Sequence, residues 1–232
     1  MYHKLVPEQT VATIVTLKQR IEERFPGAGL GKVCDELCEV AKDSKSRAEK
    51  IARPDYLLRS LVGAITILGL LALVYSISLM EISFNNIEAG EFVQIVESGL
   101  NDLVFISAAI FFLITFETRI KRSRALDALH ELRSIAHVID MHQLTKDPSR
   151  VQANVLLTRS SPEVTMTAYE LTRYLDYCSE MLSLTGKVAA LYGLNFRDGV
   201  VLAAVTEIEN LTTGLSRKIW QKIVILQKLS EQ

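Results

Sequence analysis

Histidine, arginine and aspartate side chains gather in one segment near the middle of the chain. His130 and His137 are seven residues apart, and Arg133, His137 and Asp140 follow one another at spacings of four and three, which places them along one ridge of a helix. His142 comes near the end of the same predicted helix. Such a group could bind an anion, a metal or a nucleotide, and several histidines on one face could sense pH. The alternative, a more common arrangement, is a hydrated helix face with intrahelical ion pairs.

A second set of candidate residues lies in an apolar segment. Asn101, Ala108 and Thr115 share one helix face at seven-residue spacing, and Asp102 stands beside Asn101. In a symmetric ring of subunits this face would line a pore, and Asp102 would form a cation-attracting mouth. The alternative is close packing of these small residues against the preceding apolar segment. That segment has a matching face of small residues: Gly63, Thr66, Gly69, Ala72 and Ser76.

Two other patterns could hold a ligand, but each has a simpler explanation. The segment 27–32 (GAGLGK) resembles a phosphate-binding loop, yet Pro26 and Val33 stand where that loop needs Gly and Ser or Thr. A glycine-rich turn between helices explains it better. Cys34 and Cys38 share a helix face, but zinc normally takes four ligands and none of the others is near in sequence. We therefore expect two buried cysteines, no metal and no cofactor.

Enzyme motifs are scarce in this sequence. There is no metal-protease helix, nucleophile elbow or dinucleotide fingerprint, so we expect a protein that is not an enzyme. Arg124 and His130 satisfy the Arg-x(4–6)-His pattern and in this respect the segment resembles HEPN-type ribonucleases, which are all-helical. Ala125 replaces the polar residue that usually follows that arginine. The resemblance implies a more distant alternative, a membrane-bound helical nuclease.

Two long apolar segments indicate a membrane protein. Leu61–Met80 runs twenty residues without a charge, and at about 1.5 Å per residue such a helix spans roughly 30 Å, the hydrocarbon thickness of a bilayer. Leu103–Phe116 is shorter and reaches spanning length from Ser98 if Asn101 and Asp102 lie at the interface. A pair of buried core helices is the alternative.

Basic residues set the expected orientation. They stand before the first apolar segment (Arg47, Lys50, Arg53, Arg59) and after the second (Arg119, Lys121, Arg122, Arg124). The connection 81–102 has no Lys or Arg and several acids. The positive-inside rule then places both termini in the cytoplasm. We expect a two-pass integral protein of a bacterial inner membrane, with the lipid bilayer as its first partner.

Helical periodicity covers the remaining sequence, so we expect an all-α protein: a two-span transmembrane hairpin whose second helix continues into a cytoplasmic helical bundle. The expected domains are an N-terminal cytoplasmic helical hairpin (1–53), a transmembrane hairpin (54–118) with a short acidic external loop (81–102), and the cytoplasmic bundle (119–232). Because no Gly or Pro follows the second span until Pro148, the second helix should run for roughly forty residues.

Apolar stripes predict which faces of the bundle helices are buried. One stripe of the long helix comprises Ala125, Ala128, Leu129, Leu132, Ile135, Ala136 and Ile139, opposite Ser123, Asp127, His130, Ser134, His137 and Met141. The next helix, expected from a capping box at Ser160 and Glu163 to about Tyr192, carries two adjacent seams in a coiled-coil-like alternation, which implies more than one partner helix. Asn195 is expected to cap the last helix.

Composition narrows the function classes. The 232 residues carry a net charge of −1, so no nucleic-acid partner is expected. Three cysteines form no disulfide framework and indicate a reducing compartment. The expected function is a homo-oligomeric membrane protein, a cation-conducting channel or pore gated by its cytoplasmic bundle. The alternative is a membrane-anchored scaffold or adaptor that recruits a cytoplasmic protein partner.

Overall fold

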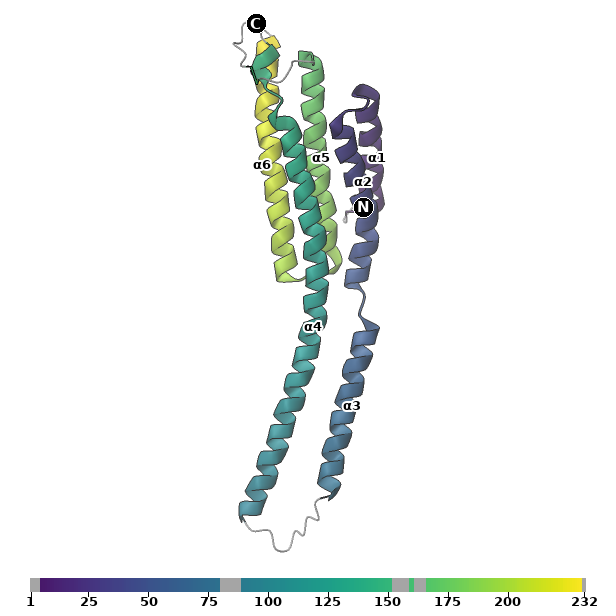
Figure 1. Ribbon diagram of the computed structural model, residues 1–232, viewed down its shortest axis with the longest axis vertical. Coiled ribbons are helices and arrows are strands. Elements are labelled where there is room, and N and C mark those ends of the chain that lie inside the picture. The colour runs from purple at the N-terminus through teal and green to yellow at the C-terminus, as the bar shows by residue number, and fades with distance from the viewer. Residues whose placement is uncertain (1–4, 80–88, 152–158, 161–165, 231–232) are drawn as a thin grey trace. The chain divides into compact units, whose positions relative to one another are not determined.

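Helices make up all regular secondary structure in the part of the chain that the structure describes, residues 5–79, 89–151, 159–160 and 166–230 (Figure 1). The structure is a computed structural model. Its elements are α1 (Pro7–Arg24), α2 (Gly29–Ala52), α3 (Tyr56–Leu79), α4 (Ala89–Leu144), a short 3-10 helix η1 (Pro148–Val151), α5 (Ala168–Asn195) and α6 (Gly199–Ser230). The predicted all-helical class is confirmed for these residues.

The chain divides into two compact units. The first, which we call the bundle, combines Met1–Ala52 with Arg124–Gln232, and the second, which we call the hairpin, is Arg53–Ser123. The helix α4 contributes to both, because the division falls within it. Contacts of α1 and α2 with α5 join the N-terminal segment to the C-terminal helices, within one compact unit.

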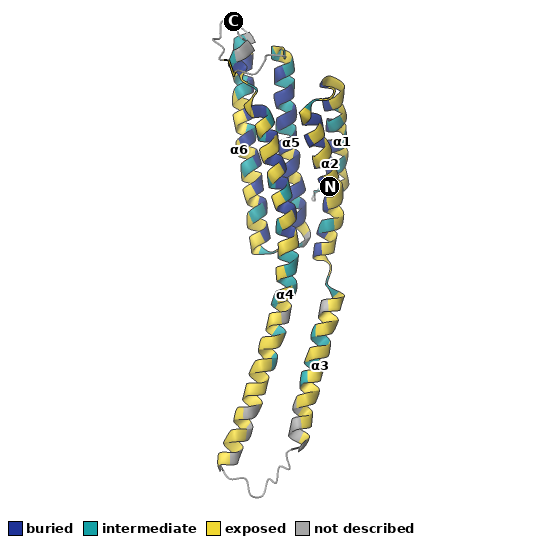
Figure 2. Ribbon diagram, in the orientation of Figure 1, coloured by how far each residue is buried: buried dark blue, intermediate teal, exposed yellow. Residues whose placement is uncertain are grey.

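The core of the bundle follows the predicted stripes. On α4 every residue of the apolar stripe from Ala125 to Ile139 is buried, and every residue of the opposite polar face is exposed. Leu132 and Ile139 have no exposed surface. Figure 2 shows these buried faces in dark blue on the bundle helices. Burying one such side chain stabilises the fold by about 1.5–3 kcal/mol, so the 3.6-residue period of α4 is enforced by its packing.

The helix α5 has two buried seams because it packs against α6 and also against α1 and α2. The predicted seam residues from Leu171 to Tyr192 are buried, among them Tyr174, Tyr177 and Met181 of the second seam. The prediction of more than one partner helix is therefore confirmed.

The N-terminal caps of α5 and α6 are formed by Thr167 and Asp198, and the predicted cap of the last helix at Asn195 was wrong. The helix α5 begins at Ala168, where the Thr167 hydroxyl accepts a hydrogen bond from the Glu170 backbone N–H and the Glu170 carboxylate accepts one from the Thr167 N–H. Most of the predicted Ser160–Glu163 box lies outside the described residues. Asn195 is the last residue of α5. The α6 N-terminus is capped instead by Asp198, whose Oδ1 accepts from the N–H groups of Val200 (3.0 Å) and Val201 (3.2 Å).

The turn between α1 and α2 contains the glycine-rich segment 27–32. Gly27 has φ +71°, a left-handed conformation that favours glycine, and its N–H donates to Glu22 Oε1 at 3.3 Å. The helix α2 begins at Gly29. The segment is thus the helix–helix turn that we expected, with no preceding strand among the described residues.

The hairpin contains α3 and the first part of α4. Because α4 begins at Ala89, residues 89–102 are helical, although we expected them in the connecting loop. The helix has 56 residues, longer than predicted. It is long and apolar enough to cross a membrane by length and composition, whereas the apolar part of α3, Arg59–Ala72, is shorter within the described residues. Figure 2 shows both helices exposed over most of their surface.

Candidate functional site

The predicted polar ridge of α4 does not form one site. Arg133 reaches across to α6, where its Nη2 lies 2.5 Å from Glu207 Oε2. Asp140 accepts a hydrogen bond from the side chain of Gln143 at 2.6 Å. His130 and His137 are exposed, and neither has a hydrogen bond or ion pair within the described residues. The four predicted residues therefore turn to different partners or to solvent.

His142 differs from the other two histidines of α4 because it is half-buried in the bundle. Its Nδ1 lies 3.3 Å from the hydroxyl of Tyr174, on α5. It also fills the space beside Gly29, where an added Cβ would come within 2.7 Å of the ring carbon Cε1. Burial lowers the pKa of His142, and the charge of Lys146 lowers it further. The ring is thus held in its neutral form against the start of α2 and the side of α5.

A lysine of α6 closes the C-terminal end of α4. Lys222 Nζ donates to the carbonyl oxygens of Gln143 at 2.7 Å and Lys146 at 3.1 Å. The Gln143 carbonyl also accepts from the backbone N–H of Lys146, which lies just beyond the end of α4. A cation at this end complements the helix dipole. Burial lowers the pKa of Lys222, opposed by Asp147 and Asp140. The ammonium therefore fixes the end of α4 to α6.

Gln143, whose carbonyl Lys222 meets, has a polar side-chain atom that is buried without a partner. Its Oε1 has no hydrogen bond to the described residues, while its amide nitrogen donates to Asp140 Oδ1 at 2.6 Å. Lys146 Nζ lies 5.0 Å from the centre of the Tyr174 ring, within range of a cation–π interaction. His142, Lys146, Lys222 and Tyr174 thus form a polar cluster, which we call the α4 end cluster. The cluster fixes the end of α4 to α5 and α6, and it contains one titratable imidazole ring, that of His142.

Sequence reasoning missed three of the four residues of the α4 end cluster, Lys146, Lys222 and Tyr174. Lys222 lies on α6, 79 and 76 residues after the carbonyls of Gln143 and Lys146 that it meets. Tyr174 lies on α5, and its hydroxyl meets His142, 32 residues earlier in the chain. Both contacts join residues far apart in the chain, so no local spacing indicates them.

The candidate pore face lies on the part of α4 that belongs to the hairpin. Asn101, Asp102 and Ala108 are exposed, and Thr115 is half-buried with its hydroxyl donating to the Phe111 carbonyl at 2.7 Å. The contact with α3 lies elsewhere on the helix. A Cβ added at Gly69 would be 3.7 Å from Ile106, and at about 100° per residue Ile106 is on the opposite side from Ala108 and Thr115. Asn101 and Ala108 are therefore exposed on the side of α4 that faces away from the contact between Gly69 and Ile106.

Asp102 does not share the direction of Asn101. Neighbouring residues on a helix are separated by about 100°, so Asp102 points closer to the side of Ile106. Its side chain is exposed. Asp102 lies about 120° around α4 from Ala108 and about 140° from Thr115, thirteen residues after the start of the helix at Ala89. Its carboxylate would therefore act on ions through its charge and would not line the pore face.

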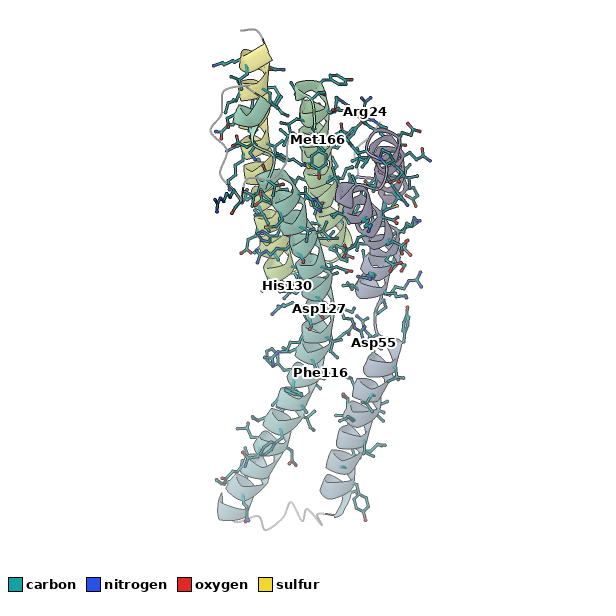
Figure 3. The ribbon with its side chains drawn as sticks, turned by 45° about the horizontal axis from the view of Figure 1, so that its top comes forward. Arg24, Asp55, Phe116, Asp127, His130 and Met166 are labelled. Atoms are coloured by element: carbon teal, nitrogen blue, oxygen red, sulfur yellow. The ribbon has the colours of Figure 1, made fainter. Side chains whose placement is uncertain are left out.

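An ion cluster at the other end of the hairpin was also missed. Glu117 accepts hydrogen bonds from the backbone N–H of Asp55 at 3.3 Å and from Arg59 Nε at 3.2 Å, and its other contact is Lys121 Nζ at 2.8 Å. Figure 3 labels Asp55 ahead of α3 and Phe116, the neighbour of Glu117, on α4. The carboxylate joins the first turn of α3 to α4.

Other candidate chemistry is not assembled in the described residues. No group of three or more His, Cys, Asp or Glu side chains there could hold a metal. Cys34 is a buried thiol, and burial raises its pKa to about 12, helped by Cys38. Arg124 and His130, the residues of the ribonuclease-like pattern, are both exposed on one helix, six residues and therefore about 120° apart. Figure 3 labels His130 and, one turn earlier, Asp127.

Comparison with known proteins assigns this chain to no family. No protein-family model, no curated protein and no solved structure matches it.

Proposed function

We propose that the hairpin is a two-pass membrane anchor with both termini of the chain in the cytoplasm. The observation that carries this proposal is its exposed apolar surface: Leu68 is 70% exposed, Phe105 74% and Phe111 72%. Soluble monomers rarely expose contiguous apolar surface on this scale. Lipid tails would cover these side chains and remove their apolar surface from water, which is favourable. The bases that flank the two apolar segments support the orientation.

The Glu117 cluster supports a hairpin whose helix ends share one aqueous boundary. Arg59 near the start of α3 and Lys121 on α4 both contact the Glu117 carboxylate. Charged groups are costly in hydrocarbon and collect at the interface. The cluster would therefore mark the cytoplasmic limit of both spans.

We propose further that the chain assembles into a homo-oligomer that conducts cations. The support is the open face of α4: Asn101 and Ala108 are exposed and lie opposite the contact with α3. Small residues allow close approach of helices between subunits, and polar groups on such a face can replace part of the hydration of an ion. Asp102 would then attract cations at the outer end of the pore.

The proposed gate is the cytoplasmic bundle. The helix that carries the pore face continues without interruption into the bundle core. Its far end is held by the α4 end cluster, in which Lys222 and Tyr174 belong to other helices. A change in the packing of these helices would therefore act directly on the helix that lines the pore.

The test begins with the mass of the full-length protein purified in detergent, measured by native mass spectrometry. A closed ring of four or more subunits is expected. A monomer or dimer would refute the pore, because two to four helices do not enclose one. Carbonate extraction of membranes tests the anchor separately.

The ring is then reconstituted in planar bilayers for conductance recordings. Asp102→Asn should shift the reversal potential toward lower cation selectivity. Glu209→Gln on α6 is the control, since it removes the same charge from an exposed position of the bundle, away from the face of Asn101, Ala108 and Thr115. Equal shifts in both variants would show a general surface-charge effect and remove Asp102 from the pore mouth.

A second candidate function is a membrane-anchored scaffold. The observation that favours it is the exposure of large apolar side chains on the bundle itself, with Met141 at 64% and Trp220 at 61%. Aromatic residues and methionine are enriched at protein interfaces. In this case the protein would be a monomer or dimer in detergent, and Met141→Ser or Trp220→Ser would abolish capture of a cytoplasmic partner without affecting membrane insertion.

A further inference from the structure

We propose that the bundle binds the phosphate group of an anionic phospholipid in a pocket between α2 and α4. This inference rests on the proposed membrane anchor. The pocket has a volume of about 420 Å³. Its polar lining comes from Arg47, Lys50, Arg124, Asp127 and Glu131, and its apolar lining from Ile51 and Ala128.

Two of the three bases in this pocket are available for a ligand. Arg47 is already paired, with Glu131 at 2.6 Å and Asp43 at 3.3 Å. Lys50 and Arg124 are exposed, and neither has a carboxylate within ion-pair distance in the described part of the chain. Arginine and lysine bind phosphate through charge-assisted hydrogen bonds. The pocket thus offers two cations from different helices to one anion.

The position of the pocket along the chain connects it with lipid. Lys50 is two residues before Ala52 and Arg124 is the first residue of the second segment, so both crossings from the bundle to the hairpin start at this pocket. Arg124 follows Thr118, the end of the predicted transmembrane hairpin, by six residues. The length of this stretch of chain alone limits the distance between the two residues to about 21 Å. If the hairpin spans a bilayer, the pocket lies near the cytoplasmic leaflet, whose anionic headgroups attract bases.

Asp127 is the residue of the pocket whose removal should change the affinity for an anion in the opposite direction. It lines the same pocket, it is exposed, and it has no cation within ion-pair distance in the described residues. Glu131, in contrast, is compensated by Arg47. Asp127 therefore opposes the binding of an anion, and its removal should strengthen binding while the loss of Lys50 or Arg124 weakens it.

The experiment measures the dissociation constant of phosphatidylglycerol for the full-length protein in detergent, by native mass spectrometry. Lys50→Gln and Arg124→Gln should each weaken binding about fivefold, and the double variant about twenty-five-fold. Asp127→Asn should tighten it roughly two- to fivefold. The matched control is Arg217→Gln with Lys218→Gln on α6, which removes the same charge from exposed positions outside the pocket. Circular dichroism checks that each variant is folded.

Three results would overturn the proposal. An equal loss in the α6 control would show diffuse attraction instead of a site. Binding of glycerol 3-phosphate as tight as that of the lipid, with the same dependence on Lys50 and Arg124, would assign the pocket to a soluble phosphate compound. Absence of phosphatidylglycerol binding in a protein that resists carbonate extraction would refute the pocket alone, whereas failure to resist extraction would refute the membrane anchor as well.

Discussion

The replacement Lys222→Met removes the contact between α6 and the end of α4. The variant keeps the apolar part of the side chain and loses two hydrogen bonds, to the carbonyls of Gln143 (2.7 Å) and Lys146 (3.1 Å). A hydrogen bond from a charged donor contributes about 1.5–3 kcal/mol, but the partly buried ammonium is itself desolvated, which offsets part of the gain. We expect a net loss of about 2 kcal/mol in the free energy of unfolding.

Thermal unfolding and amide exchange measure this loss. For a chain of this size about 2 kcal/mol corresponds to a decrease in Tm of roughly 4–8 °C. The amide of Lys146, which donates to the Gln143 carbonyl just beyond the end of α4, should exchange faster. Lys218→Met, on an exposed position of the same helix, is the control. If both variants unfold at the same temperature with the same exchange pattern, Lys222 does not fix the end of α4.

Three further predictions concern single side chains of the bundle. Burial lowers the pKa of His142, so the unfolded chain binds a proton more readily than the native protein. The free energy of unfolding should therefore fall as the pH decreases below about 6.5 and level off below the native pKa. Urea unfolding of the wild type and of His142→Gln over this pH range measures the difference, and equal pH slopes would contradict the prediction. Leu132→Ala, at a position with no exposed surface, should cost about 2–5 kcal/mol in urea unfolding, and a loss under 1 kcal/mol would mean that the site collapses around the gap. Burial raises the pKa of Cys34 and of Cys178 to about 12, so neither thiol should react with maleimide in the native protein, and rapid labelling at neutral pH would show that the core opens.

Helical periodicity made the buried faces predictable. The stripe from Ala125 to Ile139 and both seams of α5 depend on a repeat of 3.6 residues, which is a local property of the sequence. The buried faces were predicted correctly because each of these helices is amphipathic over many turns. One wrongly assigned residue does not change the position of such a face.

Caps and long-range contacts were not predictable in this way. The segment before α5 contains two capping-box patterns, Ser160 with Glu163 and Thr167 with Glu170, and the pattern alone does not choose between them. Arg133 was grouped with His137 and Asp140 on its own helix, yet it pairs with Glu207, 74 residues later. Such a choice depends on which helices pack side by side, and local spacing does not contain that information.

The division of the bundle into two chain segments has a consequence for biosynthesis. The helices α1 and α2 leave the ribosome first, but α5, which covers their apolar side, ends only at Asn195. At about 5–20 residues per second the intervening stretch of roughly 140 residues takes about 7–28 s to synthesise. During that time Ile14, Leu17 and Leu37, which are fully buried in the finished protein, have only each other's helices as cover. The newly made N-terminal pair is therefore open to aggregation or chaperone binding until α5 has been synthesised.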